Sequence, residues 1–156
     1  MINVLFVCLG NICRSPMAEA VFRKLVEEAG LADQIHVDSA GTAEWHVGEP
    51  ADYRTLTVLR KHGIQYDGIA RRIQSADLRR FDYIIAMDGS NMADVTRLDR
   101  SGVLNGKLYR LMDFAPPGSP RDVPDPYYDG RFDYVYGLVE AGCRGLLDHI
   151  RGRHGL

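Results

Sequence analysis

The sequence has few cysteines, no long apolar run and no leader segment. Its 156 residues include 3 cysteines, an odd number that does not fit a disulfide scaffold. We find no signal peptide at the start of the sequence and no apolar stretch long enough to cross a membrane. These absences favour a reduced, cytoplasmic protein without a membrane partner.

An excess of charge of one sign is also lacking, because 19 Lys and Arg residues against 21 Asp and Glu residues give a formal net charge of −2. This balance gives no support for nucleic-acid binding, and the basic pairs 71–72 and 79–80 are interpreted as solvated surface. Internal repeats and low-complexity segments are absent. With an ordinary apolar fraction of 46%, residues 1–156 are expected to form one domain.

Strand-like and helix-like segments alternate along the chain, which indicates a parallel sheet with helices on both faces. Apolar runs predict four strands, at residues 4–7, 35–39, 83–87 and 107–111. Helical spacing with start and stop signals predicts helices at residues 16–26, 53–62, 75–78, 88–98 and 132–150. We therefore expect a three-layer α/β/α fold with four parallel strands and a site at their carboxyl ends. The strand order that we expect is 2-1-3-4.

The most informative segment runs from Cys8 to Ser15, between the first strand and the first helix. Ser15 is expected to cap this helix and Pro16 to be its first residue. A loop at a helix N-terminus points backbone N–H groups at one place, where the helix dipole helps an anion to bind. Arg14 can add two parallel hydrogen bonds to phosphate oxygens. The same field favours the thiolate of Cys8, which becomes a nucleophile at neutral pH.

A long irregular segment, residues 113–130, is rich in proline and carboxylates. Such loops in compact domains are functional or disordered, and we interpret this one as functional because Cys8 needs an acid partner. The candidate acids are Asp122, Asp125 and Asp129. Spacing alone does not choose among them. Together with Asp133 they lack the glycine and ligand spacing of a calcium loop, so we expect no metal and no cofactor.

The Cys-(five residues)-Arg-Ser loop near the N-terminus and the segment Asp125-Pro126-Tyr127-Tyr128 together resemble the low-molecular-weight protein tyrosine phosphatase family. Similar segments at 38–42, 45 and 86–88 extend the resemblance over nearly the whole chain. It implies that Cys8 attacks phosphorus, that a phosphocysteine forms, and that Asp125 is the general acid and then the general base. The phosphate-binding loop would consist of Leu9, Gly10, Asn11, Ile12, Cys13 and Arg14.

The resemblance also implies residues that support this loop, namely Asn11, Ser39 and Asp88. Asn11 would take a left-handed backbone conformation, with the same latitude at Gly10. Ser15 would donate its hydroxyl to the sulfur of Cys8. Many family members place a histidine, bonded to the loop asparagine, at the position of Gly68, so that water or a backbone group would replace it here.

Substrate choice is expected to follow from the pocket walls. By resemblance these are Leu9, Ile12, Trp45, Tyr127 and Tyr128. A deep slot favours phosphotyrosine over phosphoserine, which is too short to reach the thiolate. Core packing is the alternative interpretation of the single tryptophan. A protein-arginine phosphatase branch of the family carries threonine in place of Ile12, so isoleucine favours tyrosine.

Two other functions stay open at this point. Arsenate reductases share the fold and loop but need further cysteines, and residues 83–111 contain none. A phosphotyrosine-binding module would keep Arg14 but lose the nucleophile or the acid. The partners expected for an enzyme are phosphotyrosine-containing proteins and a cognate tyrosine kinase acting on residues 127 and 128, and we expect a monomer.

The remaining cysteines have separate interpretations. Cys13 either forms a reversible disulfide with Cys8 or is a small buried apolar residue. Cys143 falls in the last predicted helix and is expected to pack there.

Overall fold

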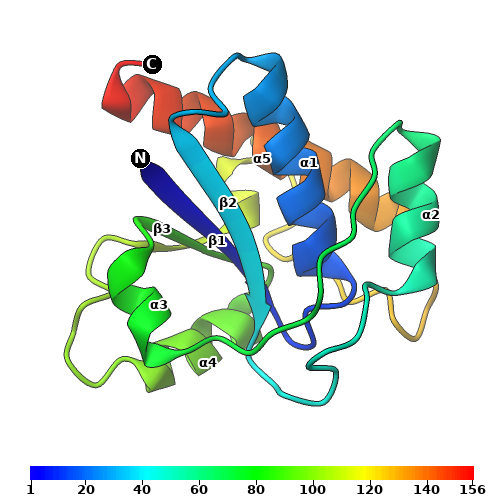
Figure 1. Cartoon of the computed structure of the whole chain (residues 1–156), viewed down its shortest axis with the longest axis horizontal. Coiled ribbons are helices and arrows are strands. Elements are labelled where there is room, and N and C mark those ends of the chain that lie inside the picture. The colour runs from blue at the N-terminus through cyan, green and yellow to red at the C-terminus, as the bar shows by residue number, and fades with distance from the viewer.

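The computed structural model describes residues 1–156 and contains one sheet of four parallel strands in the order β2-β1-β3-β4 (Figure 1). The strands are β1 (Ile2–Cys8), β2 (Ile35–Gly41), β3 (Tyr83–Ala86) and β4 (Leu108–Arg110). The helices are α1 (Arg14–Glu28), α2 (Tyr53–Lys61), α3 (Ser75–Arg80), α4 (Gly89–Leu98), α5 (Phe132–His154) and a 3-10 turn, η1 (Leu111–Phe114). The predicted strand order and helix positions are confirmed. No helix has the length and apolar character needed to span a bilayer.

The sheet is covered on both faces, because successive side chains of a strand point to opposite sides. In β1, Val4 and Phe6 face a core that they share with α1 and α5. Leu5 and Val7 face a second core under α3 and α4. Figure 1 shows α1, α2 and α5 on one side of the strands and α3 and α4 on the other. The predicted three-layer arrangement is therefore present, and it brings the ends of the strands to one edge.

The start of α1 differs from the prediction. The helix begins at Arg14 with Cys13 as its cap residue, so the expected cap at Ser15 is wrong. The hydroxyl of Ser15 is engaged elsewhere, with Cys8 and Asn11. Pro16 becomes the third helical residue, where its missing N–H costs nothing because first-turn N–H groups have no acceptor within the helix.

Two glycines of α5 lie against η1, which precedes the long loop. A Cβ built on Gly145 would stand 1.7 Å from the carbonyl oxygen of Phe114, and one on Gly142 would stand 2.6 Å from Cγ of Leu111. These glycines look in the sequence like tolerated interruptions of the helix. The structure shows that close approach of α5 to η1 requires them.

Candidate active site

The candidate site lies at the carboxyl ends of the strands, as predicted. Cys8 is the last residue of β1, Asp88 follows β3 by two positions, and Arg14 opens α1. A pocket of about 130 Å³ gathers residues from three separate segments of the chain. It is lined by Cys8, Leu9, Gly10, Ile12, Cys13, Arg14, Trp45, His46, Asp125, Tyr127 and Tyr128. Because all four strands are parallel, each of them ends at this edge of the sheet, which explains why residues distant in sequence meet here.

In the loop of residues 8–14, backbone carbonyls are hydrogen-bonded to the rest of the protein, whereas backbone N–H groups are not. Four carbonyl oxygens accept hydrogen bonds of 2.8 to 3.2 Å from the segment 42–55. The acceptors are Cys8, Leu9, Ile12 and Cys13, and the donors are Thr42, Ala43, Asp52 and Thr55. By contrast, no backbone N–H of residues 9–14 donates to another group of the protein. Unpaired N–H groups at a helix N-terminus form an anion site.

Arg14 is held rigidly beside this loop and is only 3% exposed. Its Nη1 donates to Oδ2 of Asp88 at 2.6 Å and to the carbonyl of Val123 at 3.0 Å. Its Nη2 lies 3.8 Å from Oδ2 of Asp125. Burial alone would lower the pKa of Arg14, but the nearby Cys8, Asp88 and Asp125 outweigh it and raise the pKa. The guanidinium therefore stays charged in a buried place.

The sulfur of Cys8 lies 3.0 Å from the hydroxyl oxygen of Ser15. That oxygen accepts a hydrogen bond of 2.8 Å from Nδ2 of Asn11, which leaves the Ser15 proton free to point at the sulfur. Asn11 has a φ of 58°, the left-handed conformation that was expected for it. Gly10 does not share that conformation. Its missing side chain instead makes room for His46, whose Cδ2 would stand 3.0 Å from a Cβ there.

The side-chain amide of Asn11 has three partners. Nδ2 donates to Ser15 and, at 2.9 Å, to the hydroxyl of Ser39. Oδ1 accepts from the backbone N–H of Arg71 at 3.0 Å. A backbone group therefore bonds the loop asparagine in this chain, which is one of the two substitutes expected where Gly68 replaces a histidine. Because Oδ1 needs a donor and Nδ2 needs acceptors, these contacts fix the orientation of the amide.

The structure separates the carboxylates of the long loop. Asp125 lines the pocket, and the backbone N–H of Tyr127 donates to its Oδ1 at 3.0 Å. Asp122 pairs with Arg110, Asp129 with Arg131, and Asp133 with Lys61. Nowhere in the chain do three or more His, Cys, Asp or Glu side chains gather as a metal site would need. Of the candidate acids, Asp125 is the one that reaches the nucleophile's pocket.

The pocket walls are aromatic at the mouth and aliphatic below. Trp45 is 70% exposed and Tyr128 is 92% exposed, and both line the pocket. Core packing, the alternative interpretation of Trp45, is therefore wrong. The rings of Tyr127 and Tyr128 meet edge to face at 4.9 Å, an arrangement that is favourable for aromatic pairs. Ile12, only 8% exposed, lies among the residues that line the pocket.

Sequence reasoning missed three residues around the site. His46 lines the pocket, its Nδ1 lies 3.1 Å from Oε2 of Glu49, and its only signal was its place beside Trp45. Glu19 is 5% exposed and accepts from the hydroxyls of Ser39 and Tyr66. A carboxylate at helical spacing among the apolar residues of α1 was the signal that could have found Glu19. Nothing in the sequence points to Tyr66.

The remaining two cysteines are buried. Cys143 is fully buried in α5, as expected. Cys13 is 5% exposed and contributes to the pocket. Burial raises the pKa of both thiols, with help from Asp52 at Cys13 and from Glu140 at Cys143. Both are therefore protonated at neutral pH.

Comparison with known proteins agrees with this geometry. The family model of low molecular weight phosphotyrosine protein phosphatase matches residues 3–154. The low molecular weight protein-tyrosine-phosphatase YfkJ of Bacillus subtilis is 48% identical over 153 residues, which is 97% of each chain. The crystal structure of YfkJ covers 98% of this chain and 96% of its own, with a TM-score of 0.93.

A eukaryotic relative shows the same similarity. The low molecular weight phosphotyrosine protein phosphatase of Schizosaccharomyces pombe is 52% identical over 130 residues, which is 83% of each chain. The match of the family model over nearly the whole chain, with identities near one half, leads to one assignment. The chain belongs to the low molecular weight phosphotyrosine protein phosphatase family.

Proposed function

We propose that this protein is a tyrosine phosphatase that hydrolyses phosphotyrosine in proteins through a phosphocysteine intermediate. One observation carries the proposal. The unpaired N–H groups of residues 9–14 and the buried guanidinium of Arg14 surround the sulfur of Cys8 in a pocket with aromatic walls. Fixed donors around a reacting phosphoryl group stabilise the charge on its equatorial oxygens.

In the first step the thiolate of Cys8 attacks phosphorus in line with the tyrosyl oxygen. The S–P bond forms as the P–O bond breaks, while Arg14 and the loop amides bind the three equatorial oxygens. A tyrosyl oxygen leaves poorly as an anion, so protonated Asp125 donates its proton to it. Tyrosine is released with a neutral hydroxyl, and Asp125 becomes a carboxylate.

In the second step water attacks the phosphocysteine. The carboxylate of Asp125 takes a proton from the water, a new P–O bond forms, and the S–P bond breaks. The electron pair returns to Cys8, where the hydroxyl of Ser15, 3.0 Å away, stabilises the thiolate. Inorganic phosphate leaves, and Asp125 is again protonated for the next cycle.

The expected substrates are phosphotyrosines in exposed protein segments. Trp45 and Tyr127 would hold the substrate ring between them, while the pocket depth would exclude phosphoserine. The exposed ring of Tyr128 would be accessible to a cognate tyrosine kinase. We further propose that residues 1–156 act as one catalytic domain, as a monomer and in the cytoplasm.

A substrate panel tests the proposal. We expect the wild type to hydrolyse p-nitrophenyl phosphate and phosphotyrosine peptides, and to leave phosphoserine and phosphoarginine peptides intact. Cys8→Ser should bind phosphotyrosine peptides without turnover, because a serine hydroxyl is not ionised at neutral pH. Binding without turnover by the wild type would indicate a binding module instead. Faster hydrolysis of phosphoarginine would indicate an arginine phosphatase.

A further inference from the structure

A hydrogen-bonded chain leads from the nucleophile to a residue outside the pocket. It runs from Cys8 through Ser15, Asn11 and Ser39 to Glu19, with steps of 3.0, 2.8, 2.9 and 2.6 Å. The last step joins Glu19 Oε1 to the hydroxyl of Tyr66 at 2.8 Å. Tyr66 belongs to the segment after α2, whereas the other members come from β1, the phosphate loop, β2 and α1.

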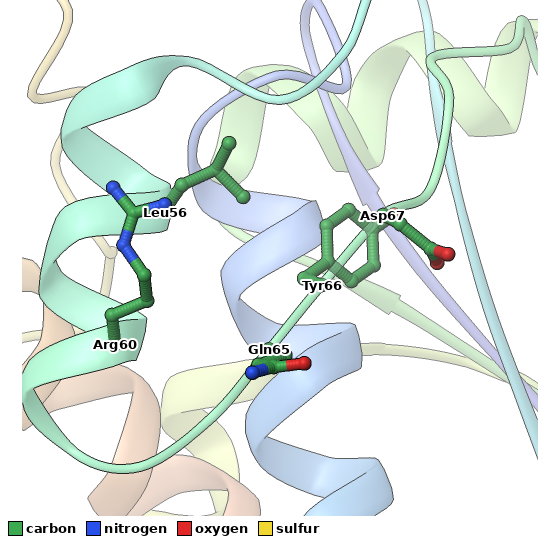
Figure 2. Close-up of a pocket in the computed structure, with 5 residues that line it drawn as sticks. All are labelled: Leu56, Arg60, Gln65, Tyr66 and Asp67. Carbon is green, nitrogen blue, oxygen red and sulfur yellow. The ribbon is translucent and has the colours of Figure 1, made fainter.

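Figure 2 shows Tyr66 beside a pocket of about 400 Å³, which Leu56, Arg60, Gln65 and Asp67 also line. One side of its ring therefore contacts this solvent-filled pocket, while its hydroxyl reaches the buried Glu19. The outer end of the chain lies near the surface on the α2 side of the molecule. This second pocket and the active-site pocket share no lining residue.

The direction of every donor in the chain is fixed by chemistry. The NH₂ group of Asn11 can only donate, so the oxygens of Ser15 and Ser39 both accept from it. The Ser39 proton then points to the carboxylate of Glu19, and the Ser15 proton points to the sulfur of Cys8. The hydroxyl of Ser39 is thereby held between Asn11 and Glu19, and the hydroxyl of Ser15 between Asn11 and Cys8.

Glu19 needs donors because it is a carboxylate that is 5% exposed. It receives them from Tyr66, Ser39 and Arg23. A buried carboxylate that loses a donor is left with an unsatisfied oxygen, which costs free energy and favours movement of the side chain. Burial and the charge of Glu19 raise the pKa of Tyr66, so the phenol stays protonated and donates across the working pH range.

A nearby glycine, Gly68, leaves space for the contact between Tyr66 and Glu19. A Cβ on Gly68 would lie 2.1 Å from the hydroxyl oxygen of Tyr66. The φ of Gly68 is not in the left-handed region, so backbone strain does not explain a glycine at this place. The space next to Glu19 is filled by the phenol of residue 66, and any side chain at position 68 would displace it.

We propose that Tyr66 is a positioning residue for the phosphatase reaction: its hydroxyl holds the side chain of Glu19 in place, and Glu19 in turn fixes the Ser39, Asn11 and Ser15 side chains, the last of which donates to the Cys8 thiolate. The inference rests on the proposed function for its catalytic consequence. The coupling between residue 66 and the ionisation of Cys8 can be measured without turnover.

The test compares Tyr66→Phe with Tyr136→Phe. Tyr136 is a matched control, because it packs into the same core as the partly buried Tyr66 and its hydroxyl also donates to a glutamate, Glu140, at 3.5 Å. For each protein, the rate of Cys8 alkylation by iodoacetamide is measured against pH, together with kcat and KM for p-nitrophenyl phosphate. Thermal unfolding monitors the structural cost of each change.

We expect Tyr66→Phe to move the midpoint of the alkylation curve up by about half a pH unit and to lower kcat at pH 7 by about threefold to tenfold. KM should change less than twofold, because Arg14 and the loop amides are retained. Tyr136→Phe should lower the unfolding temperature without moving the alkylation curve. An unmoved curve in Tyr66→Phe, or an equal shift in both variants, overturns the inference.

A second variant guards against poor folding of the first. Gly68→Ala keeps the tyrosine but pushes its hydroxyl away from Glu19, so its alkylation curve should shift in the same direction. An unmoved curve in folded Gly68→Ala also overturns the inference. Failure of the proposed function is recognised separately, since a wild type without phosphatase activity still reports the ionisation of Cys8 by alkylation.

Discussion

The guanidinium of Arg14 and the carboxylate of Asp88 form a buried ion pair, with 2.6 Å between Nη1 and Oδ2 and side-chain exposures of 3% and 22%. The pair joins the first residue of α1 to the end of β3, 74 positions later. It uses Nη1, so Nη2 remains on the side of Asp125 and the pocket. Asp88 thereby fixes the donor that the phosphate needs. Its other oxygen caps α4 by accepting from the N–H of Asn91 at 2.8 Å.

Replacing Asp88 by asparagine separates the two roles of this residue, which are the ion pair with Arg14 and the cap of α4. Asparagine is a good N-cap, so α4 should remain intact while the charged anchor of Arg14 is lost. We expect KM for p-nitrophenyl phosphate and the inhibition constant of inorganic phosphate to rise together by about 5- to 30-fold, which corresponds to about 1–2 kcal/mol for a charge-assisted bond. Asp122→Asn, which breaks a surface pair with Arg110, is the control and should change neither constant. A normal KM in Asp88→Asn contradicts the anchoring role.

Replacing Asp125 by asparagine should remove the proton donor while keeping the turn, because the amide oxygen can still accept from the N–H of Tyr127. We expect kcat on phosphotyrosine peptides to fall by about 10²- to 10⁴-fold. The fall should be smaller on p-nitrophenyl phosphate, whose leaving group departs without protonation. The decrease of kcat at high pH, which reports loss of the proton from Asp125, should disappear. Unchanged turnover would transfer the role to Asp122 or Asp129.

The three cysteines should differ in their reaction with iodoacetamide at pH 7. Burial raises the pKa of Cys13 and Cys143, so their reactive thiolates form only at higher pH. Cys8 lies in the anion site and should be the single residue labelled, with protection by inorganic phosphate. Mass spectrometry of tryptic peptides locates the label. Rapid labelling of Cys13 would show that its thiol is ionised in the native protein.

Peroxide treatment distinguishes the two interpretations of Cys13. Cys8 and Cys13 line the same pocket, and a sulfenic acid formed on Cys8 can condense with a thiol to give a disulfide. A protective disulfide predicts that a thiol reductant restores activity in the wild type and not in Cys13→Ala. Recovery of over-oxidised Cys8 alone from the wild type would leave Cys13 as a buried apolar residue.

Alanine substitutions at two glycines of α5 should have opposite effects on the free energy of unfolding. Gly145→Ala brings a Cβ to 1.7 Å from the Phe114 carbonyl, so we expect a loss of about 1–3 kcal/mol in the free energy of unfolding. Gly152 has nothing within 4 Å of such a Cβ, and Gly152→Ala should gain about 0.5–1 kcal/mol of stability from helix propensity. Urea unfolding of both variants measures the difference. Equal effects would mean that α5 does not pack closely on η1.

Much of the fold is readable from local pattern. The apolar runs that end at Val7 and Ala86 identify strands, and the alternation of strands with helices requires parallel pairing. The loop from Cys8 to Arg14 is recognisable because nucleophile, arginine and helix start are adjacent in sequence. The predicted helix cap at Ser15 was wrong. Serine is a common cap residue, but here its hydroxyl interacts with the sulfur of Cys8.

The sequence by itself determined the strands and helices, the nucleophile and the phosphate loop, because those depend on periodicity and on residues that are close together in the sequence. Only the tertiary structure decided which carboxylate reaches the pocket, how Asn11 is held and why Glu19 and Tyr66 matter. Those answers depend on contacts between residues that are 20 to 111 positions apart. Such contacts form when helices pack on the two faces of the sheet, and no local preference of the chain encodes them.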